Sequence, residues 1–306
     1  MNNINLNEVL KQFHIEHSIE RYGNGHINDT YLVQPNEYIL QRINTNIFKK
    51  PYELMENIEN VTEFIREKIL KSGGNPDRET LTVIKTVDEK SCYKYDEQNY
   101  FRMYKFITDT VSIENEKTNQ ILFNAGKGFG RFQNLLDDFP VGLLHETIVD
   151  FHNTPKRIEA LKKSIENDAA GRAGSVQSEI DFALSHADFA DVVVEGLKDQ
   201  SIPTRVTHND TKINNILFDK DTLEAVCVID LDTVMPGSAL YDFGDALRMG
   251  ASTAAEDETD LSRVWFSEEA FQHFSRGYCQ EMGGRLAKSE VDLLYLAPKL
   301  LTYECG

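Results

Sequence analysis

The sequence predicts an α+β protein of two lobes, a strand-rich N-terminal lobe over residues 1–107 and a mostly helical lobe over residues 108–306. A chain of 306 residues is long for a single hydrophobic core. Short apolar and aromatic runs between turn formers fill the first third of the sequence, whereas helical periodicity dominates from Asn119 onward. The pattern changes at residues 104–108, which we expect to form the hinge between the lobes.

The first lobe is predicted to combine antiparallel strands with one long helix. A short amphipathic helix comes first, because apolar residues recur at helical spacing from Leu6 to Phe13. Pro51 opens the long helix, and an apolar stripe carries it to about Leu70. Strands are predicted at 38–43, 81–87, 91–95 and 100–106.

The second lobe is predicted to be helical apart from one β-hairpin. Glycines within the run 125–131 look like a dinucleotide-binding loop, but no strand precedes them, so close helix packing is favoured. The segment 154–200 is expected to form two helices. Two apolar runs, 216–218 and 225–229, flank a stretch of turn formers and predict the hairpin.

Polar residues are predicted to converge at one end of this hairpin. Asn215 precedes its first strand and Asp230 follows its second, so antiparallel pairing brings them together. The spacing His208-x-Asp210-x4-Asn215 matches the catalytic loop of kinases, in which the Asp accepts the substrate hydroxyl proton and the Asn binds Mg²⁺. We therefore predict Asp210 as the base, Asn215 and Asp230 as Mg²⁺ ligands, and Lys212 as a cation that reaches the transferring phosphoryl group. The alternative is turn and capping chemistry around an ordinary hairpin.

A second motif, Asp-Phe-Gly at 242–244, spells the kinase metal-binding tripeptide, but we do not assign the metal to it. It lies 32 residues after Asp210, whereas Asp230 lies 20 residues after it, and it opens a helix. Asp242 is predicted to cap that helix or to brace the catalytic loop from behind. Asp245 and Arg248, on the same helix, either form a surface ion pair or line the acceptor pocket.

The first lobe offers candidate contacts to ATP, the implied phosphoryl donor. Gly23 and Gly25 form either an ordinary hairpin turn or a loop whose amides approach phosphates, and His26 and Asn28 at its tip are either turn residues or substrate contacts. Arg42, where a kinase keeps its phosphate-pairing lysine, either assists the phosphates or lies on a solvated strand face. The remaining candidates are Met103 beside the hinge, whose backbone groups are expected to hold the adenine, and three glutamates of the long helix. Glu56, Glu59 and Glu63 either pair with Arg42 or, as is favoured for each of them, form an exposed acidic helix face.

The composition excludes some classes of binding partner and indicates the cellular compartment. The formal net charge is −18, with 50 acidic against 32 basic residues, which argues against binding nucleic acid or an anionic membrane. The four cysteines are scattered without metal-site spacing, and no leader-like or membrane-length apolar run is present, so we expect a cytoplasmic protein with reduced thiols. Apolar residues persist almost to Gly306, from which we expect the natural chain to continue further.

These motifs resemble those of the aminoglycoside phosphotransferase and choline kinase superfamily. The stretches 207–218, 226–237 and 241–248, together with Gly-Asn-Gly-His-Ile-Asn and Leu-Gln-Arg-Ile-Asn, look most like bacterial N-acetylhexosamine 1-kinases. The resemblance implies a two-lobed protein-kinase-like fold and transfer of phosphate from ATP, with Mg²⁺, to the anomeric hydroxyl of an N-acetylated amino sugar. It also implies Asp210 as base and Asn215 and Asp230 on the metal, with Asp232 in the same motif. Asn209 stands where this superfamily often has Gly.

Two further functions remain open from the sequence. One is a small-molecule kinase of the same superfamily that acts on another sugar, an amino alcohol or an aminoglycoside; the acidic surface would suit a cationic acceptor. The other is a non-catalytic nucleotide-binding relative, against which the intact set of Asp210, Asn215 and Asp230 argues.

Overall fold

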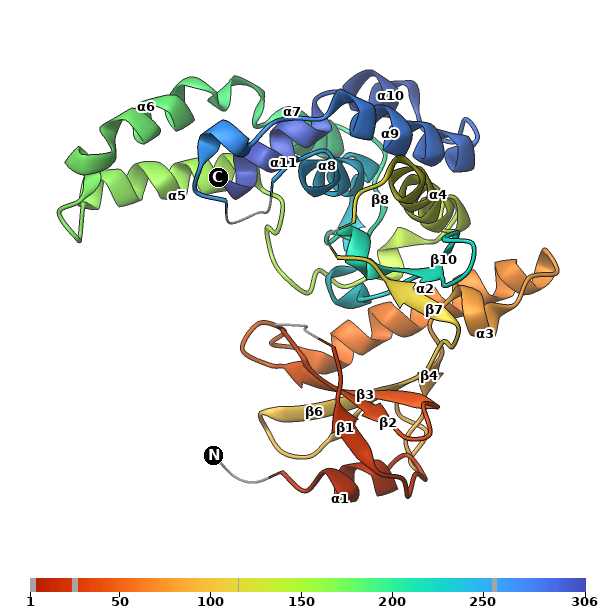
Figure 1. Cartoon of the computed structure of the whole chain (residues 1–306). Helices are drawn as coiled ribbons and strands as arrows, with labels where there is room; N and C mark the ends of the chain where they lie inside the picture. The colour runs from red at the N-terminus through yellow and green to blue at the C-terminus, as the bar shows by residue number, and fades with distance from the viewer. Residues whose placement is uncertain (1–3, 24–26, 115, 255–257) are drawn as a thin grey trace.

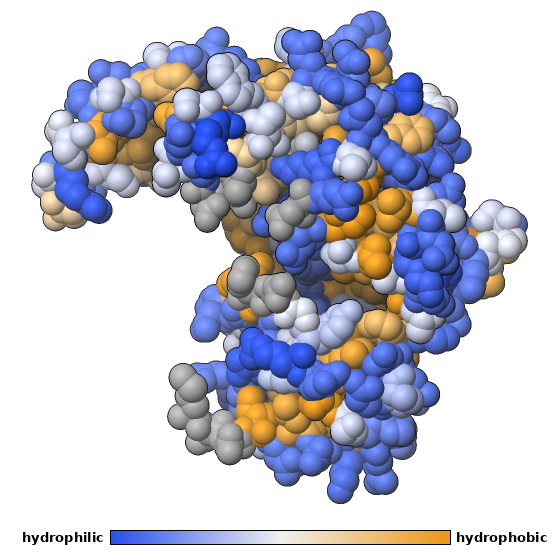
Figure 2. All heavy atoms as spheres, in the orientation of Figure 1, coloured by the Kyte–Doolittle hydropathy of each residue, from blue (hydrophilic) through white to orange (hydrophobic). Residues whose placement is uncertain are grey.

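The computed structural model describes residues 4–23, 27–114, 116–254 and 258–306. Figure 1 shows strands and the N-terminus at the bottom and most helices at the top, so we call the part up to Lys105 the sheet region and the part from Asn119 the helical region. The space-filling view shows a deep hollow between the two regions on the left (Figure 2). The predicted α+β architecture, with an antiparallel sheet followed by helices, is confirmed.

The sheet region is built on six strands whose neighbours all pair antiparallel. Their order is β1-β2-β3-β6-β4, and β5 pairs with another part of β6. The predicted strands 81–87 and 91–95 are shorter in the structure. The first of them ends early, because the amides of Thr86 and Val87 bond to the carbonyl oxygens of Lys90, in a turn, and of Gln12, just after the first helix, instead of to a strand. The elements are α1 (Leu6–Lys11), β1 (Ile19–Arg21), β2 (Asp29–Val33), β3 (Tyr38–Asn44), α2 (Pro51–Lys71), α3 (Pro76–Glu79), β4 (Val83–Ile84), β5 (Tyr93–Lys94) and β6 (Asn99–Lys105).

The two faces of this sheet are covered by different helices. Alternate residues of a strand point to opposite faces, and on β6 Phe101 and Met103 pack in the cluster under α1. Tyr100 and Tyr104 pack instead in the cluster of the long helix α2. Arg102, which lies between these two tyrosines, therefore faces the side of α2.

The helical region is held together by the crossing of α4 and α9. A Cβ built on Gly126 would lie 2.1 Å from the Phe274 carbonyl oxygen, and one on Gly277 would lie 2.1 Å from the Phe123 carbonyl oxygen. The two backbones therefore touch where neither helix carries a side chain, as predicted for the run 125–131. The helices are α4 (Asn119–Leu135), α5 (Thr154–Asn167), α6 (Gln177–Ser185), α7 (Val192–Lys198), α8 (Ala239–Gly250), α9 (Glu268–Met282), α10 (Lys288–Leu293) and α11 (Ala297–Cys305).

The segment 154–200 forms three helices, so the prediction of two is wrong. Helix α5 ends at Asp168, whose backbone is left-handed (φ 35°) and whose carboxylate accepts from the amides of Arg172 and Ala173. The following stretch breaks again at His186, which separates α6 from α7. Helices α5 and α6 project to the left in Figure 1 and bury little of their surface.

Two small sheets lie where the two regions meet. The predicted hairpin is confirmed as β9 (Ile216–Asp219) and β10 (Ala225–Val228), and β7 (Thr110–Ser112) adds a third strand to it. Strands β8 (Arg205–Thr207) and β11 (Met235–Gly237) form the second sheet. Among the residues that the structure describes, no helix is long and apolar enough to cross a membrane.

Candidate active site

The loop after β8 is held in place by a carboxylate from behind. Asp242 accepts hydrogen bonds from the backbone amides of His208 (2.9 Å) and Asn209 (2.8 Å) and from Gln133 Nε2 (2.7 Å). Asn209 has a φ of 66°, a left-handed conformation that, Gly aside, Asn adopts more readily than most residue types. The helix cap of α8 is Ser238, so Asp242 braces the loop and does not cap the helix.

We expect Asp242→Asn to destabilise the fold. The substitution turns one acceptor oxygen into an NH₂ group that faces a backbone or amide N–H in a fully buried site. We expect the free energy of unfolding to fall by about 2–4 kcal/mol in urea titration. The matched variant Asp292→Asn, in an exposed ion pair of α10, should change it by less than about 1 kcal/mol. If Asp242→Asn were as stable as wild type, Asp242 would not be the residue that holds the loop in place.

The predicted base, amide and lysine lie together at the front of this loop. Asn215 Nδ2 donates to the Asp210 carbonyl oxygen (2.8 Å) and to Asp210 Oδ2 (3.0 Å). Lys212 Nζ lies 3.7 Å from Asp210 Oδ1, and the Asp210 side chain keeps 26% of its surface exposed. A proton can therefore reach the Asp210 carboxylate, and the amide orientation leaves Asn215 Oδ1 for another ligand.

Asp230 meets this group from the end of the hairpin, as predicted. The Ile229 amide donates to the Asn215 carbonyl oxygen (2.9 Å), and His208 Nε2 lies 2.9 Å from the Ile229 carbonyl oxygen. In the described part of the chain, no hydrogen bond or ion pair engages the Asp230 carboxylate. Burial first, and then the neighbouring charge of Asp232, raise the pKa of Asp230 from its ordinary value of 3.8 to about 7.

Asn215 and Asp230 fit a Mg²⁺ ion that is shared with a bound phosphate. Across the described residues, no three His, Cys, Asp or Glu side chains are grouped so as to hold a metal alone. Mg²⁺ is commonly bound through one or two carboxylates plus phosphate oxygens and water. Among the described residues the Asp230 carboxylate has no partner, so it and the Asn215 amide oxygen would supply the protein ligands of such a site.

The sheet region reaches this site through Arg102 and Asn28. Arg102 forms an ion pair with Asp232, and its Nε donates to Gln41 Oε1 (3.0 Å). Asn28 Nδ2 donates to Asp232 Oδ2 (2.7 Å). Arg102 is not among the residues predicted from the sequence; the signal for it is a single cation within the otherwise apolar and aromatic strand core 100–104.

The structure places Arg42 on the opposite face of the sheet. There it pairs with Asp29 and donates to Asn99 Oδ1 (3.0 Å). The prediction of a glutamate partner from the long helix is wrong, because Glu59 pairs with Lys85 and Glu56 contacts His145. The physical reason is strand alternation, which turns Gln41 toward Arg102 and Arg42 away from it.

The other predicted contacts are placed as follows. The Met103 side chain is fully buried in the cluster under α1, facing away from Arg102 and its site. Gly23 has a φ of 72°, a conformation suited to glycine, whereas Gly25 and His26 lie outside the described residues. Asp245 Oδ2 accepts from the Thr211 amide (2.8 Å).

The pair of Asp245 and Arg248 lies beside the catalytic loop. Arg248 Nη2 is 3.1 Å from Asp245 Oδ1, with side-chain exposures of only 11% and 9%. The ion pair of the first alternative therefore forms, but it lies largely buried and not at the surface. These two charges lie close enough to the loop to contribute to an acceptor pocket.

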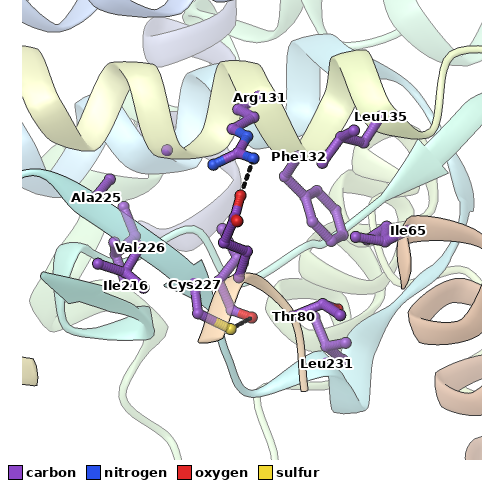
Figure 3. Close-up of a pocket in the computed structure, with 13 residues that line it drawn as sticks. Ile65, Thr80, Arg131, Phe132, Leu135, Ile216, Ala225, Val226, Cys227 and Leu231 are labelled. Carbon is purple, nitrogen blue, oxygen red and sulfur yellow. Dashed lines mark hydrogen bonds and ion pairs between the residues drawn. The ribbon is translucent and has the colours of Figure 1, made fainter. Parts of the chain in front are cut away.

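A small cavity lies on the side of the hairpin that packs against α4, and Leu231, which stands between Asp230 and Asp232, is among its lining residues. Figure 3 shows it between α4 and the hairpin, lined by Ile65, Phe132 and Cys227, with the ion pair of Arg131 and Glu79 across it. Its volume is about 30 Å³, room for roughly one water molecule. It is too small for a nucleotide or sugar.

Comparison with known families agrees with this geometry. The sequence profile of the phosphotransferase enzyme family matches residues 18–286. The chain belongs to the phosphotransferase enzyme family. The match includes the catalytic loop, the hairpin and Asp242.

Solved structures share the fold of this phosphotransferase at low sequence identity. A microcompartment-associated aminopropanol kinase has a TM-score of 0.62 at 17% identity, covering 98% of this chain and 88% of that one. The GDP complex of aminoglycoside 2'-phosphotransferase-IIIa has a TM-score of 0.57 at 15% identity, covering 96% and 87%. A choline/ethanolamine kinase family protein from Mesorhizobium loti has a TM-score of 0.52 at 15% identity, covering 94% and 77%. The phosphotransferase therefore has the two-lobed, protein-kinase-like fold that its motifs predicted.

Proposed function

We propose that this phosphotransferase is an ATP- and Mg²⁺-dependent kinase that phosphorylates the anomeric hydroxyl of an N-acetylhexosamine. The observation that carries the proposal is the convergence of Asp210, Asn215 and Asp230 at the end of the hairpin, with Asp210 accessible and with no partner for the Asp230 carboxylate among the described residues. The sugar acceptor is supported by the resemblance of residues 205–250 to N-acetylhexosamine 1-kinases.

Each residue has a separate task in this reaction. Asp210 orients the acceptor hydroxyl and accepts its proton, while Lys212 stabilises charge on the transferring phosphoryl group. Asn215 and Asp230 would hold Mg²⁺, which neutralises charge on the nucleotide phosphates when bound. The Asp242 brace fixes the backbone that presents Asp210. Asp245 and Arg248 are the proposed contacts of the acceptor end of the site, and Gly23 is a proposed contact of the nucleotide. The amide of Asn28, also a candidate substrate contact, is already bonded to Asp232 and to the Asn44 amide.

A second acceptor class is favoured by charge. The net charge of −18 would attract a cationic amino alcohol or aminoglycoside. Several similar structures carry such names, including the aminopropanol kinase and a spectinomycin phosphotransferase in complex with ADP and its drug. The acceptor test must therefore include both classes.

We expect N-acetylglucosamine or N-acetylgalactosamine to be phosphorylated at roughly 1–100 turnovers per second, the usual range of kinases. The measurement is ATP consumption over a panel of sugars, amino alcohols and aminoglycosides. The methyl glycoside of the active sugar is the matched control, because its anomeric hydroxyl is blocked. Phosphorus-coupled NMR should show the C1 proton split by phosphorus, in an α-configured product. A phosphate on C6, or turnover confined to cationic acceptors, contradicts the sugar 1-kinase.

A further inference from the structure

The buried carboxylate of Asp232 joins the two regions of the molecule. Asp232 is 3% exposed and Arg102 is 1% exposed, so their ion pair is removed from solvent. Asn28 donates to the second carboxylate oxygen (2.7 Å) and is itself fixed, because its Oδ1 accepts from the Asn44 amide (3.0 Å). Gln41 orients the guanidinium of Arg102. Arg102 from β6 and Asn28 from just before β2 thus contact the same side chain, that of Asp232.

The backbone around Asp232 belongs to the catalytic group. Asp232 follows Asp230 by two residues, within a single helical turn at Leu231–Thr233. Thr233 Oγ1 donates to the His208 carbonyl oxygen (2.7 Å), and the Thr233 carbonyl oxygen accepts from Asn209 Nδ2 (2.8 Å). The segment that carries Asp230 is therefore tied to the catalytic loop on one side and to the sheet on the other.

This link differs from the lysine–glutamate pair of protein kinases. There a lysine on the third strand pairs with a glutamate of the following helix. Here the third strand presents Gln41, and Glu59 of α2 pairs with Lys85 beside the edge strand β4, where the Lys85 side chain is 43% exposed. The buried cation comes from β6, and its partner lies in the metal-site segment itself.

We propose that Arg102 and Asn28 are positioning residues that clamp Asp232 and thereby hold Asp230 in register with Asp210. This inference rests on the proposed kinase function. The attraction within a buried ion pair offsets the cost of desolvating the two charges only when their geometry is good. The planar guanidinium of Arg102 can contact Gln41 and Asp232 at the same time. A lysine keeps the positive charge but loses this two-sided contact. The clamp thus acts through the geometry of Asp232, whose own contact with substrate is not required.

The test compares Arg102→Lys, Asn28→Ala and the control Lys85→Gln in the whole chain. We expect Arg102→Lys to lower kcat and the affinity for divalent metal by about 10–100-fold, the usual effect of removing a residue that orients a metal ligand. Mn²⁺ binding, measured by electron paramagnetic resonance with a bound nucleotide, gives the metal affinity independently of turnover. Affinity for nucleotide without metal should change by less than about threefold, because the clamp acts on the metal side. Asn28→Ala should also lower kcat and the affinity for divalent metal, while the protein still unfolds in one cooperative thermal transition. Lys85→Gln should behave as wild type.

A double-mutant cycle separates the clamp from general damage. If Arg102 acts through Asp232, Arg102→Lys should have little further effect on Mn²⁺ affinity in an Asp232→Asn background. Additive effects, or a folded Arg102→Lys protein with wild-type Mn²⁺ affinity, would overturn the proposal. A strong effect of Lys85→Gln on Mn²⁺ affinity would also overturn it, because the kinase-type pair would then be the link. If wild type transfers phosphate to no acceptor, the kinase proposal fails, whereas the Mn²⁺ measurements still decide the clamp.

Discussion

Asp210→Asn should lower kcat by a factor of about 10²–10⁴, the range that a positioned general base supplies. The variant keeps the shape of the side chain, and the bond from Asn215 Nδ2 to the backbone carbonyl of residue 210 remains. Asparagine cannot take the proton of the acceptor hydroxyl, so the loss falls on the chemical step. Nucleotide affinity should stay within about threefold of wild type, because the lost contact is to the acceptor.

The measurement pairs steady-state turnover with titration of a fluorescent ATP analogue. Asp221→Asn, in the exposed turn of the same hairpin, is the matched control and should leave both quantities unchanged. An Asp210→Asn variant that keeps more than about a third of wild-type kcat would show that Asp210 is not the base. A large loss of nucleotide affinity would instead place it at the phosphates.

Asp230→Asn should abolish turnover, by about three orders of magnitude or more, because phosphoryl transfer depends on the metal that neutralises the phosphates. The same variant should remain folded. Asp230 has no hydrogen-bond or ion-pair partner within the described residues, and it lies near the charge of Asp232. Asp230→Ala is expected to behave alike. Near-normal activity with Mg²⁺ and ATP would remove Asp230 from the metal site.

The raised pKa of Asp230 gives this prediction a stability readout in metal-free protein. A carboxyl group whose pKa rises from 3.8 to about 7 on folding is harder to ionise in the folded state. Its contribution to stability is therefore greatest at low pH and is lost as the pH rises from about 4 to about 7. Asn does not ionise, so the stability of Asp230→Asn relative to wild type should increase between pH 5 and pH 8. Urea titrations in EDTA measure this gain, and a variant less stable than wild type at pH 8 would contradict it.

The catalytic group could be predicted from the sequence because its geometry is local. Asn215 and Asp230 flank the two strands of one hairpin, so antiparallel pairing alone brings them together. Asp242 was distinguished from a metal ligand by its place at the start of a helix. The glycines of α4 were assigned to packing because no strand preceded them.

The contacts from the sheet region could not be predicted in the same way. Alternation shows that Arg42 and Gln41 face opposite sides of a strand, but not which side meets the catalytic loop. That choice depends on how α1 and α2 cover the sheet, which only the folded chain decides. The partner of Arg102 is likewise remote in sequence, and Met103 faces α1 for the same reason.

The seam of glycines between α4 and α9 bears on how this protein can evolve. Any side chain at Gly126 or Gly277 would meet backbone atoms of the other helix, so these positions tolerate almost no substitution. Phe129 and Phe132 of α4 lie edge-on against the His208 ring, so the seam also supports the catalytic loop. The projecting arm of α5 and α6, in contrast, buries only Thr154 and Ile180. Mutations can accumulate in that arm at little cost to folding, while the part of the chain that carries the chemistry stays fixed.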